Sequence, residues 1–418
     1  MLPGQTNQEG SPLNEQALRG AGKGRQRSRR RRRARILRGL GYLVGLLMLA
    51  ALILGGLAWR SCGAAATESQ LALHRRSPQY RAGRFANRLP TTQAGFFAIL
   101  RRWLSGAAHS EPDKPLAVVS RRAADFSNPP KSGLRLTWLG HSSLLIEIDG
   151  RRVLTDPVFS ERCSPWTFYG PRRFHPPPIP LEELPALDLV LISHDHYDHL
   201  DYRTIVALNE RVPRFVVPLG VGAHLAYWGV AQEKIIERDW WQSTDVADLR
   251  LIATPARHFS GRTLWDRDRT LWASWVIAGP RHRVYFSGDT AMLPQFTEIG
   301  KRYGPFDATM IEVGAYNAMW PDVHLGPEQA VQAHLMVRGR LLFPIHWGTF
   351  NLALHAWTEP VERLAVAATK YGVRWVSPRP GQWIEPAVPP AVQAWWPKLP
   401  FKTVAEDPVF SSGLQDSR

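Results

Sequence analysis

The chain has 418 residues, 44% hydrophobic and 21% charged, a composition typical of a globular protein and not of a disordered one. Its formal net charge is +16. Residues 1–38 hold eleven Lys or Arg against two acidic residues, and residues 60–131 hold twelve against four, so the rest is close to neutral. A nucleic-acid-binding catalytic domain normally carries its own basic face, so this distribution argues against a nucleic-acid partner.

The first predicted element is a membrane-spanning helix at residues 39–59. These 21 positions carry no charge and follow a run of five arginines, Arg29 to Arg33. An apolar stretch of this length is sufficient to cross a bilayer. The basic tail, residues 1–38, is expected to be disordered and cytoplasmic, which puts the rest of the chain outside the cytoplasm, on the periplasmic side in a bacterium.

A cleavable signal peptide is the alternative to this anchor. The small residues Ala64 to Ala66 would provide its cleavage site. The apolar run is longer than the hydrophobic region of such a peptide usually is, which favours an uncleaved anchor.

The next stretch, residues 60–131, is predicted to be a basic arm or linker with one helix near residues 94–104. Its arginines are suited to contact with anionic lipid headgroups. The two cysteines, Cys62 and Cys163, lie too far apart in sequence to form a metal-ligand pair by spacing, and we expect both to be unpaired.

A single large folded domain is predicted from residue 132 to residue 404, followed by a disordered polar tail at residues 405–418. Strands are predicted at residues 134–139, 144–148, 152–155, 189–192, 214–217, 249–254, 272–277, 283–287, 308–313 and 341–345, with helices at residues 202–209, 327–337 and 359–371. Asp149-Gly150 is a strong hairpin signal between the second and third strands. This alternation indicates a layered α/β sandwich.

Four side chains that can bind a metal stand within six residues, directly after the strand at residues 189–192. They are His194, His196, Asp198 and His199. Histidine nitrogen and carboxylate oxygen are ligands that suit zinc. Residues two apart in an extended loop face the same way, so His194 and His196 can bind one ion, which leaves Asp198 and His199 free to face a second. A solvated polar loop is the alternative.

Three further candidates stand just past predicted strands: His258, Asp289 and His346. A lone histidine in such a place is more often structural than a ligand. Three such residues beside the first cluster reverse that expectation, because loops at strand ends are where a rigid scaffold presents chemistry.

The motifs resemble those of a known family. The order His-x-His-x-Asp-His, then His, then Gly-Asp, then His, is similar to the metallo-β-lactamase superfamily, whose fold is an αββα sandwich. More narrowly, residues 133–371 resemble the N-acyl-phosphatidylethanolamine-hydrolysing phospholipase D family. The motifs that carry this resemblance are Gly140-His-Ser-Ser, Thr155-Asp-Pro157, Ser193–Asp201, Ser287-Gly-Asp-Thr290, residues 300–307, Gly314-Ala-Tyr316 and Ile345-His-Trp-Gly-Thr-Phe350.

The resemblance implies a site with two zinc ions. His194, His196 and His258 would hold one ion, Asp198, His199 and His346 would hold the other, and Asp289 would bridge both. Asp156 would orient a ligand imidazole from behind. Histidine at position 196, where glutamate would be expected in the di-iron, oxygen-reducing branch of the superfamily, argues against that branch.

The implied activity is phosphodiester hydrolysis of a phospholipid at the membrane. Two metals lower the pKa of a bridging water and clamp the oxygens of an in-line displacement, so Asp198 and Asp289 are expected to be catalytic. His324 would hydrogen-bond the phosphate or protonate the leaving group, or else cap the following helix. His141 is interpreted as a packed, hydrogen-bonded histidine. A lactone or thioester hydrolase with the same ligands, and a non-catalytic metal-binding membrane protein, are the alternatives.

Overall fold

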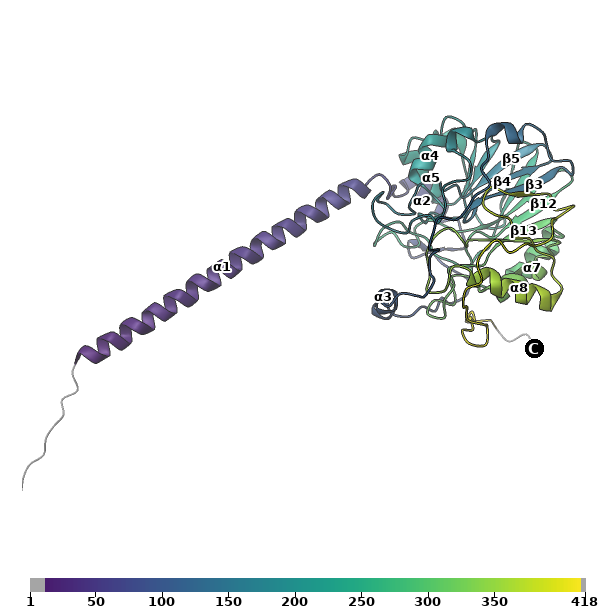
Figure 1. Cartoon of the computed structure of the whole chain (residues 1–418). Coiled ribbons are helices and arrows are strands. Elements are labelled where there is room, and N and C mark those ends of the chain that lie inside the picture. The colour runs from purple at the N-terminus through teal and green to yellow at the C-terminus, as the bar shows by residue number, and fades with distance from the viewer. Residues whose placement is uncertain (1–11, 415–418) are drawn as a thin grey trace, which may run out of the picture. The chain divides into compact units, whose positions relative to one another are not determined.

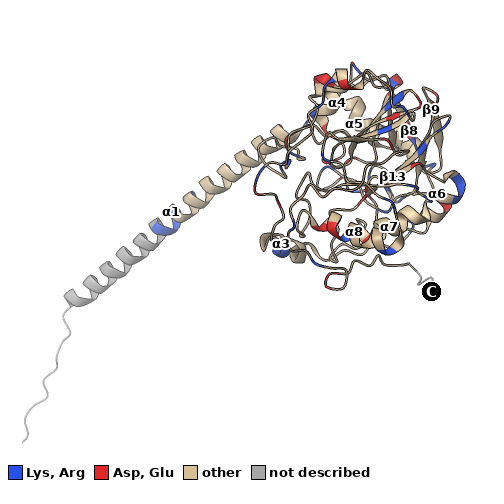
Figure 2. Cartoon of the chain, turned by 45° about the vertical axis from the view of Figure 1, so that its right-hand side comes forward, with Lys and Arg blue, Asp and Glu red and all other residues tan. Residues whose placement is uncertain are grey.

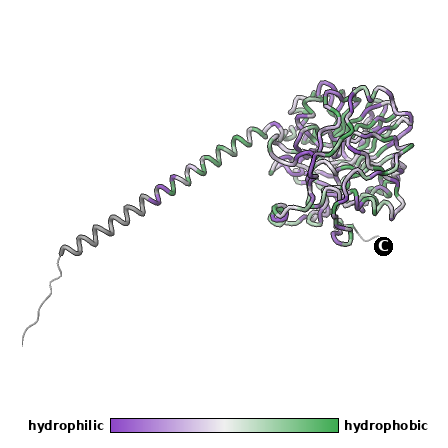
Figure 3. The backbone as a smooth tube through the Cα atoms, viewed as in Figure 1, coloured by the Kyte–Doolittle hydropathy of each residue, from purple (hydrophilic) through white to green (hydrophobic). Residues whose placement is uncertain are grey.

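The computed structural model describes residues 12–414, which divide into a helical unit ending at Trp59 and a larger unit beginning at Arg60. The first unit consists of helix α1, Pro12–Ala58 (Figure 1). Its part from Arg35 to Ala58 is long and apolar enough to cross a membrane (Figure 3). The predicted span at residues 39–59 falls almost wholly within this part.

The basic tail differs from its prediction. The structure places residues 12–38 in α1, although disorder was expected there, and residues 1–11 lie outside the described residues. Arginine, alanine and leucine are strong helix formers, so a helix already nucleated by the apolar span can extend through the arginine run.

The second unit is built on two β-sheets with helices on their outer faces (Figure 1). The seven-stranded sheet has the order β15-β3-β4-β5-β6-β7-β8, and the six-stranded sheet has the order β14-β13-β12-β11-β10-β9. The strands are β3 Leu134–Gly140, β4 Ser143–Ile148, β5 Arg151–Thr155, β6 Leu189–Leu191, β7 Phe215–Pro218, β8 Ile235–Arg238, β9 Ser243–Val246, β10 Leu249–Thr254, β11 Ser274–Ala278, β12 Arg283–Phe286, β13 Ala308–Glu312, β14 Leu342–Ile345 and β15 Trp383–Ile384.

The helices of this unit cover both sheets and complete the predicted αββα sandwich. Among the described residues they are α2 Glu68–His74, α3 Phe96–Leu104, α4 Tyr202–Leu208, α5 Val221–Tyr227, α6 Gln295–Tyr303, α7 Pro327–Met336 and α8 Glu359–Tyr371, with short 3-10 helices at Ala123–Phe126, Leu181–Glu183 and Gln232–Lys234. The short elements α5, α6, β8, β9 and β15 were not predicted, because segments of two to nine residues carry little periodicity.

Alternate side chains of the strands fill two separate cores. On β4, Leu144, Ile146 and Ile148 pack between the two sheets, whereas Leu145 packs on the other side with α4 and α5. Successive strand residues point to opposite faces, so one strand with apolar residues on both faces can serve both cores. The hairpin at Asp149-Gly150 has positive φ at both residues, as a tight two-residue turn requires.

The loops at one edge of the sandwich come from parallel strands. β5, β6, β7 and β8 run parallel in one sheet, and β12, β13 and β14 run parallel in the other. The carboxyl ends of parallel strands meet at the same edge, so the loops that follow β5, β6, β12 and β14 lie within reach of one another.

Residues 60–131 are not a separate linker. They belong to the same unit as the sandwich and carry the small hairpin of β1 Tyr80–Arg81 and β2 Arg84–Phe85 as well as α2 and α3. Phe85 is buried in the main core, and its backbone N–H donates to Asp268 O at 2.8 Å. Ile99 of α3 packs against the buried cluster that includes Trp320 and Leu354. Burial of these apolar side chains offsets the entropy cost of ordering the arm.

The predicted disorder after residue 404 is contradicted for residues 405–414. Ser412 donates from its backbone N–H to Asp322 Oδ1 at 2.7 Å, and Arg257 Nη2 donates to Ser412 O at 2.9 Å. Asp322 is fully buried, and a buried carboxylate requires hydrogen-bond donors. The tail supplies one of them and therefore packs on the domain. Residues 415–418 lie outside the described residues.

Candidate metal centre

The seven predicted ligands lie together at the edge of the sandwich, although they come from four separate loops. Their ligand atoms fall into overlapping groups within which all atoms lie within 4.8 Å of one another. The groups are His194, His196 and His258; His141, Asp198, His199 and His346; His194, His199 and Asp289; and Asp289, Glu312, His324 and His346.

The first group consists of three imidazoles. His194 Nε2 lies 2.8 Å from His196 Nδ1, and His258 Nε2 lies 3.2 Å from the same atom. Burial and the neighbouring imidazoles hold the pKa of His194 well below its ordinary value, and burial does the same for His258. Both rings are therefore neutral at pH 7, which is the form of histidine that binds a metal.

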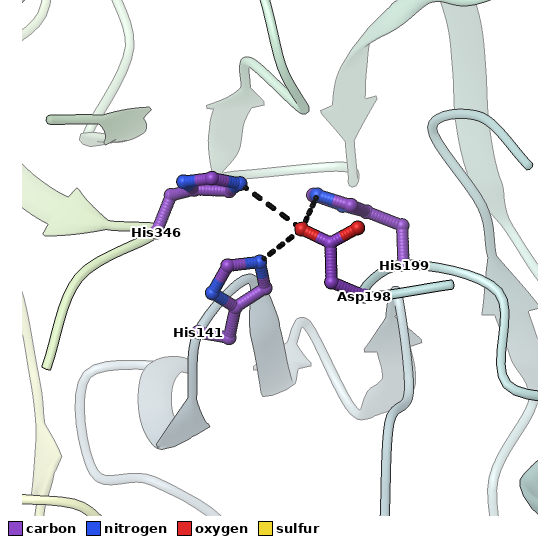
Figure 4. Close-up of side chains that lie close together, drawn as sticks. All are labelled: His141, Asp198, His199 and His346. Atoms are coloured by element: carbon purple, nitrogen blue, oxygen red, sulfur yellow. Dashed lines mark hydrogen bonds and ion pairs between the residues drawn. The ribbon is translucent and has the colours of Figure 1, made fainter. Parts of the chain in front are cut away.

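The second group surrounds the Asp198 carboxylate (Figure 4). Asp198 Oδ2 lies 2.9 Å from His141 Nε2 and 3.4 Å from both His199 Nε2 and His346 Nε2. Burial alone would raise the pKa of Asp198, but His199 and the hydrogen-bonded imidazoles hold it well below its ordinary value. His141 is buried and hydrogen-bonded, as expected, but its partner is a candidate ligand, so it belongs to the centre itself.

Asp289 touches both groups. Its Oδ2 atom lies 3.1 Å from His199 Nε2 and from His346 Nε2, 3.7 Å from His258 Nε2 and 3.9 Å from His194 Nε2. One carboxylate oxygen of Asp289 thus faces imidazoles of both groups.

Asp156 supports two of the imidazoles from behind. It accepts a hydrogen bond from His199 Nδ1 at 2.6 Å and another from Ser193 Oγ at 2.5 Å, and Ser193 Oγ lies 2.9 Å from His194 Nδ1. A carboxylate on Nδ1 fixes the tautomer that leaves Nε2 free for a ligand bond. His258 is held in the same way, because its Nδ1 lies 2.8 Å from Val323 O.

The donor atoms that face the centre fit a cation. Within residues 12–414, the buried atoms His199 Nε2, Asp289 Oδ1 and both ring nitrogens of His346 have no hydrogen-bond partner. Burial opposes a charge on His346, yet the nearby Asp289 and Asp198 carboxylates raise its pKa to about 10. A site with unpaired buried polar atoms, and with carboxylates that favour a nearby positive charge, is suited to a divalent metal.

Backbone strain also collects here. His141, Asp156 and His346 have φ values of +53°, +34° and +64°. Non-glycine residues seldom adopt such values, and strained residues of this kind cluster at functional sites. All three lie at or next to the metal centre.

Glu312 is a site residue that the sequence analysis missed. It is fully buried at the end of β13, and its Oε2 lies 2.7 Å from His324 Nδ1. Burial and the nearby Asp289 raise the pKa of Glu312 well above its ordinary value. The signal that marked the other candidates, a polar residue at the carboxyl end of a strand, applies to Glu312 as well. His324 lies beside the centre, with ring centroids 5.0 Å from His258 and 5.1 Å from His346.

Comparisons with known proteins agree with this geometry. Residues 151–347 match the family model described as the beta-lactamase superfamily domain. A Mycobacterium tuberculosis protein described as uncharacterised is 51% identical over 336 residues, which cover 78% of this chain and 89% of that one.

Two further relatives carry functional names. N-acyl-phosphatidylethanolamine-hydrolyzing phospholipase D 1 of Caenorhabditis elegans is 38% identical over 266 residues, covering 60% of this chain and 74% of that one. The mitochondrial N-acyl-phosphatidylethanolamine-hydrolyzing phospholipase D of Saccharomyces cerevisiae is 31% identical over 242 residues, covering 56% and 51%.

The fold and the cluster of histidines and aspartates thus define a metal-dependent hydrolase. The chain belongs to the metallo-β-lactamase superfamily and is a homologue of the N-acyl-phosphatidylethanolamine-hydrolysing phospholipases D.

Proposed function

We propose that the protein is a membrane-anchored phosphodiesterase that uses two zinc ions to hydrolyse N-acyl-phosphatidylethanolamine or a related phospholipid. The observation that carries the proposal is the contact of Asp289 with both groups of imidazoles. His194, His196 and His258 would hold one ion, and Asp198, His199 and His346 the other. When bound, the pair supplies an acidified water and neutralises charge on the phosphoryl oxygens.

His324 and Glu312 act beside the metals. Glu312 fixes His324 through Nδ1, so the second ring nitrogen, Nε2, is the atom available to the substrate. We assign to it a hydrogen bond to the phosphate or to the leaving-group oxygen. His141 contacts Asp198 Oδ2, the same oxygen that faces His199 and His346, and we assign it a role in orienting that carboxylate.

A lipid substrate is supported by exposed apolar side chains near the centre. Ile99 of α3 and Phe259, which packs against His196 and His258, belong to one apolar cluster. On α3, Phe96 is 71% exposed, and Phe97 and Leu104 are each 81% exposed. In the loop that continues from Phe259, Leu264 and Trp265 are 91% and 73% exposed.

Exposed aromatic and leucine side chains of this kind are suited to the boundary between lipid tails and headgroups. Arg101 and Arg102 add positive charge on α3, which is complementary to anionic headgroups (Figure 2). We therefore assign α3 and the loop at residues 261–266 to the membrane-facing side of the enzyme.

We further propose that α1 anchors the chain with its arginine-rich end in the cytoplasm and the hydrolase unit on the opposite side of the membrane. The arginine run directly precedes the apolar part of the helix. The positive-inside rule places such a basic flank in the cytoplasm.

The test is to purify the full chain in detergent, measure its bound metal and compare three substrates: N-acyl-phosphatidylethanolamine, ordinary phosphatidylethanolamine and a sugar-acid lactone. Two zinc ions per chain with release of phosphatidate from the N-acylated lipid is the expected result. Turnover of the lactone without turnover of either lipid would replace the proposal with a lactone hydrolase. Bound metal with no turnover of any of the three would favour a metal-binding role without catalysis.

A further inference from the structure

The chain segment that directly follows the membrane helix is bound into the catalytic unit. We name residues 60–66 the junction segment. Its Arg60 carbonyl accepts from Trp228 Nε1 at 2.7 Å, and its Ser61 carbonyl accepts from Arg262 Nε at 2.9 Å and from Nη2 at 2.7 Å. Its Ala64 N–H donates to His224 Nδ1 at 3.0 Å. Four hydrogen bonds at residues 60, 61 and 64 thus hold the junction segment against the catalytic unit.

Arg262 joins the junction segment to the loop that carries four of the proposed ligands. Besides the Ser61 carbonyl, its guanidinium donates to the backbone carbonyls of Asp195 and Leu200, which lie at the two ends of that loop. Its Cζ atom lies 4.0 Å from the ring centroid of Tyr197, in the middle of the loop. Arg262 is only 5% exposed, so these carbonyls replace the water that its donors would otherwise bind.

A second link runs through His224. Its Nδ1 accepts from the Ala64 backbone, so Nε2 carries the proton and faces Asp195 Oδ2 at 3.3 Å. Asp195 also accepts from the Gly261 N–H and from Thr270 Oγ1, each at 2.8 Å. Since Asp195 stands between His194 and His196, this link ends between two of the proposed ligands.

Gly63 shows that the fit is close. A Cβ atom at this position would lie 2.2 Å from His224 Nδ1, and its φ of +77° suits glycine. Any residue with a Cβ at position 63 would collide with the His224 ring unless that ring moved. The junction segment and the His224 ring are thus complementary in shape as well as in hydrogen bonding.

We propose that the junction segment is a permanent positioning element of the metal centre, and that the membrane helix is therefore retained in the active enzyme and not removed as a signal peptide. The inference rests on the proposed metal function of the loop. Cleavage at Ala64–Ala66 would remove the Ser61 carbonyl and the Ala64 N–H. Buried donors of Arg262 and the Nδ1 of His224 would lose their partners, and the ligand loop would lose its support.

The experiment uses the full chain in lipid nanodiscs, loaded with zinc, and compares Gly63→Ala with Gly83→Ala. Gly83 is the matched control because its φ is +79° but nothing lies within 4 Å of an added Cβ. The measurements are the rate of zinc transfer to a chelator and the melting temperature. We expect roughly tenfold faster zinc release in Gly63→Ala, in line with the effect of removing partners behind metal ligands. Gly83→Ala should release zinc as the wild type does.

A second variant, Arg262→Lys, keeps the charge but lacks the planar fork that reaches Ser61 and the loop together, so it should also release zinc faster. If Gly63→Ala does not fold, Arg262→Lys alone decides. Wild-type release rates in the folded variants would overturn the proposal. A mature chain from the native cells whose intact mass shows that it begins near Thr67, and that still holds its full zinc, would also overturn it. Zinc release needs no substrate, so a wild type that holds zinc but cleaves no phosphodiester would refute the proposed function and not this inference.

Discussion

Two of the proposed ligand imidazoles, those of His199 and His258, are held so that only one nitrogen is left for an ion. Asp156 occupies Nδ1 of His199, and the Val323 carbonyl occupies Nδ1 of His258. In both rings Nε2 remains, and it faces Asp289. Such partners fix the tautomer and orientation of each ring in the folded protein. Metal binding therefore does not have to overcome the entropy of ordering these side chains.

Loss of one proposed ligand should therefore reduce both metal binding and activity. His194→Ala is expected to lower zinc content by at least one ion per chain and to abolish hydrolysis, because the remaining ligands of that group leave the ion incompletely coordinated. Metal analysis of the purified variant, together with an activity assay, measures both effects. His109→Asn, at an exposed histidine with φ of +55°, is the control and should change neither. Full activity in His194→Ala would contradict the metal assignment.

His324 should behave differently, because it is assigned to the substrate and not to the metals. His324→Gln is expected to lower kcat by about a hundredfold, the lower end of what general acid-base groups contribute, with zinc content unchanged. Glu312→Gln should lower kcat by less, since it leaves the imidazole present but weakens the hydrogen bond that orients it. Loss of zinc in His324→Gln would instead make His324 a ligand.

Among the elements, strands and their following loops carry the centre, while helix α3 carries the exposed apolar surface. β6, β10, β12 and β14 each end within four residues of a proposed ligand, so rigid, buried strands set the ligand positions. α3 makes no such contribution. Its residue Ile99 anchors it to the cluster beside the centre, and its exposed side chains remain available to a lipid surface.

Replacement of apolar residues on α3 should impair only interfacial catalysis. The double variant Phe97→Asp, Leu104→Ser is expected to reduce turnover of phospholipid in vesicles several-fold, because both side chains are more than four-fifths exposed and would lose their apolar contact with the bilayer. Turnover of a water-soluble short-chain phosphodiester should remain at the wild-type rate. Val366→Asp, at an exposed position of α8, is the matched control. Equal losses on both substrates would refute a membrane-facing role.

At the scale of the whole molecule, the metal centre connects the two halves of the sandwich. His194, His196, Asp198 and His199 follow β6 of the seven-stranded sheet, whereas His258, Asp289 and His346 follow strands of the six-stranded sheet. Bound ions would therefore link the two sheets at one edge. Among the described residues, His199 Nε2, Asp289 Oδ1 and both ring nitrogens of His346 have no hydrogen-bond partner there.

Metal removal should consequently destabilise the entire catalytic unit and not one loop. A ligand present at a thousandfold excess over its Kd stabilises the folded state by about 4 kcal/mol, so the zinc-loaded chain should melt several degrees above the chelator-treated chain. Differential scanning calorimetry in detergent, with a single transition in both states, measures the shift. Restored melting temperature on return of zinc is the control for irreversible damage. An unchanged melting temperature would mean that the ions do not link the sheets.

The sequence by itself determined the features that depend on local pattern. The apolar run of α1, most of the longer strands and helices, and seven candidate ligands at strand ends follow from composition, periodicity and spacing, because these are properties of neighbouring residues. The same rule would have included His141 and Glu312, but a lone histidine or glutamate is too common for spacing alone to single it out.

Only the tertiary structure decided how distant segments meet. The junction segment contacts His224 and Arg262 across at least 160 residues of chain. The arm at residues 60–131 and the tail at residues 405–414 pack on the domain because buried groups such as Asp322 require partners, and no local pattern records that requirement. Such contacts form when the sheets close on each other, since only then are the buried donors and acceptors that need them removed from water.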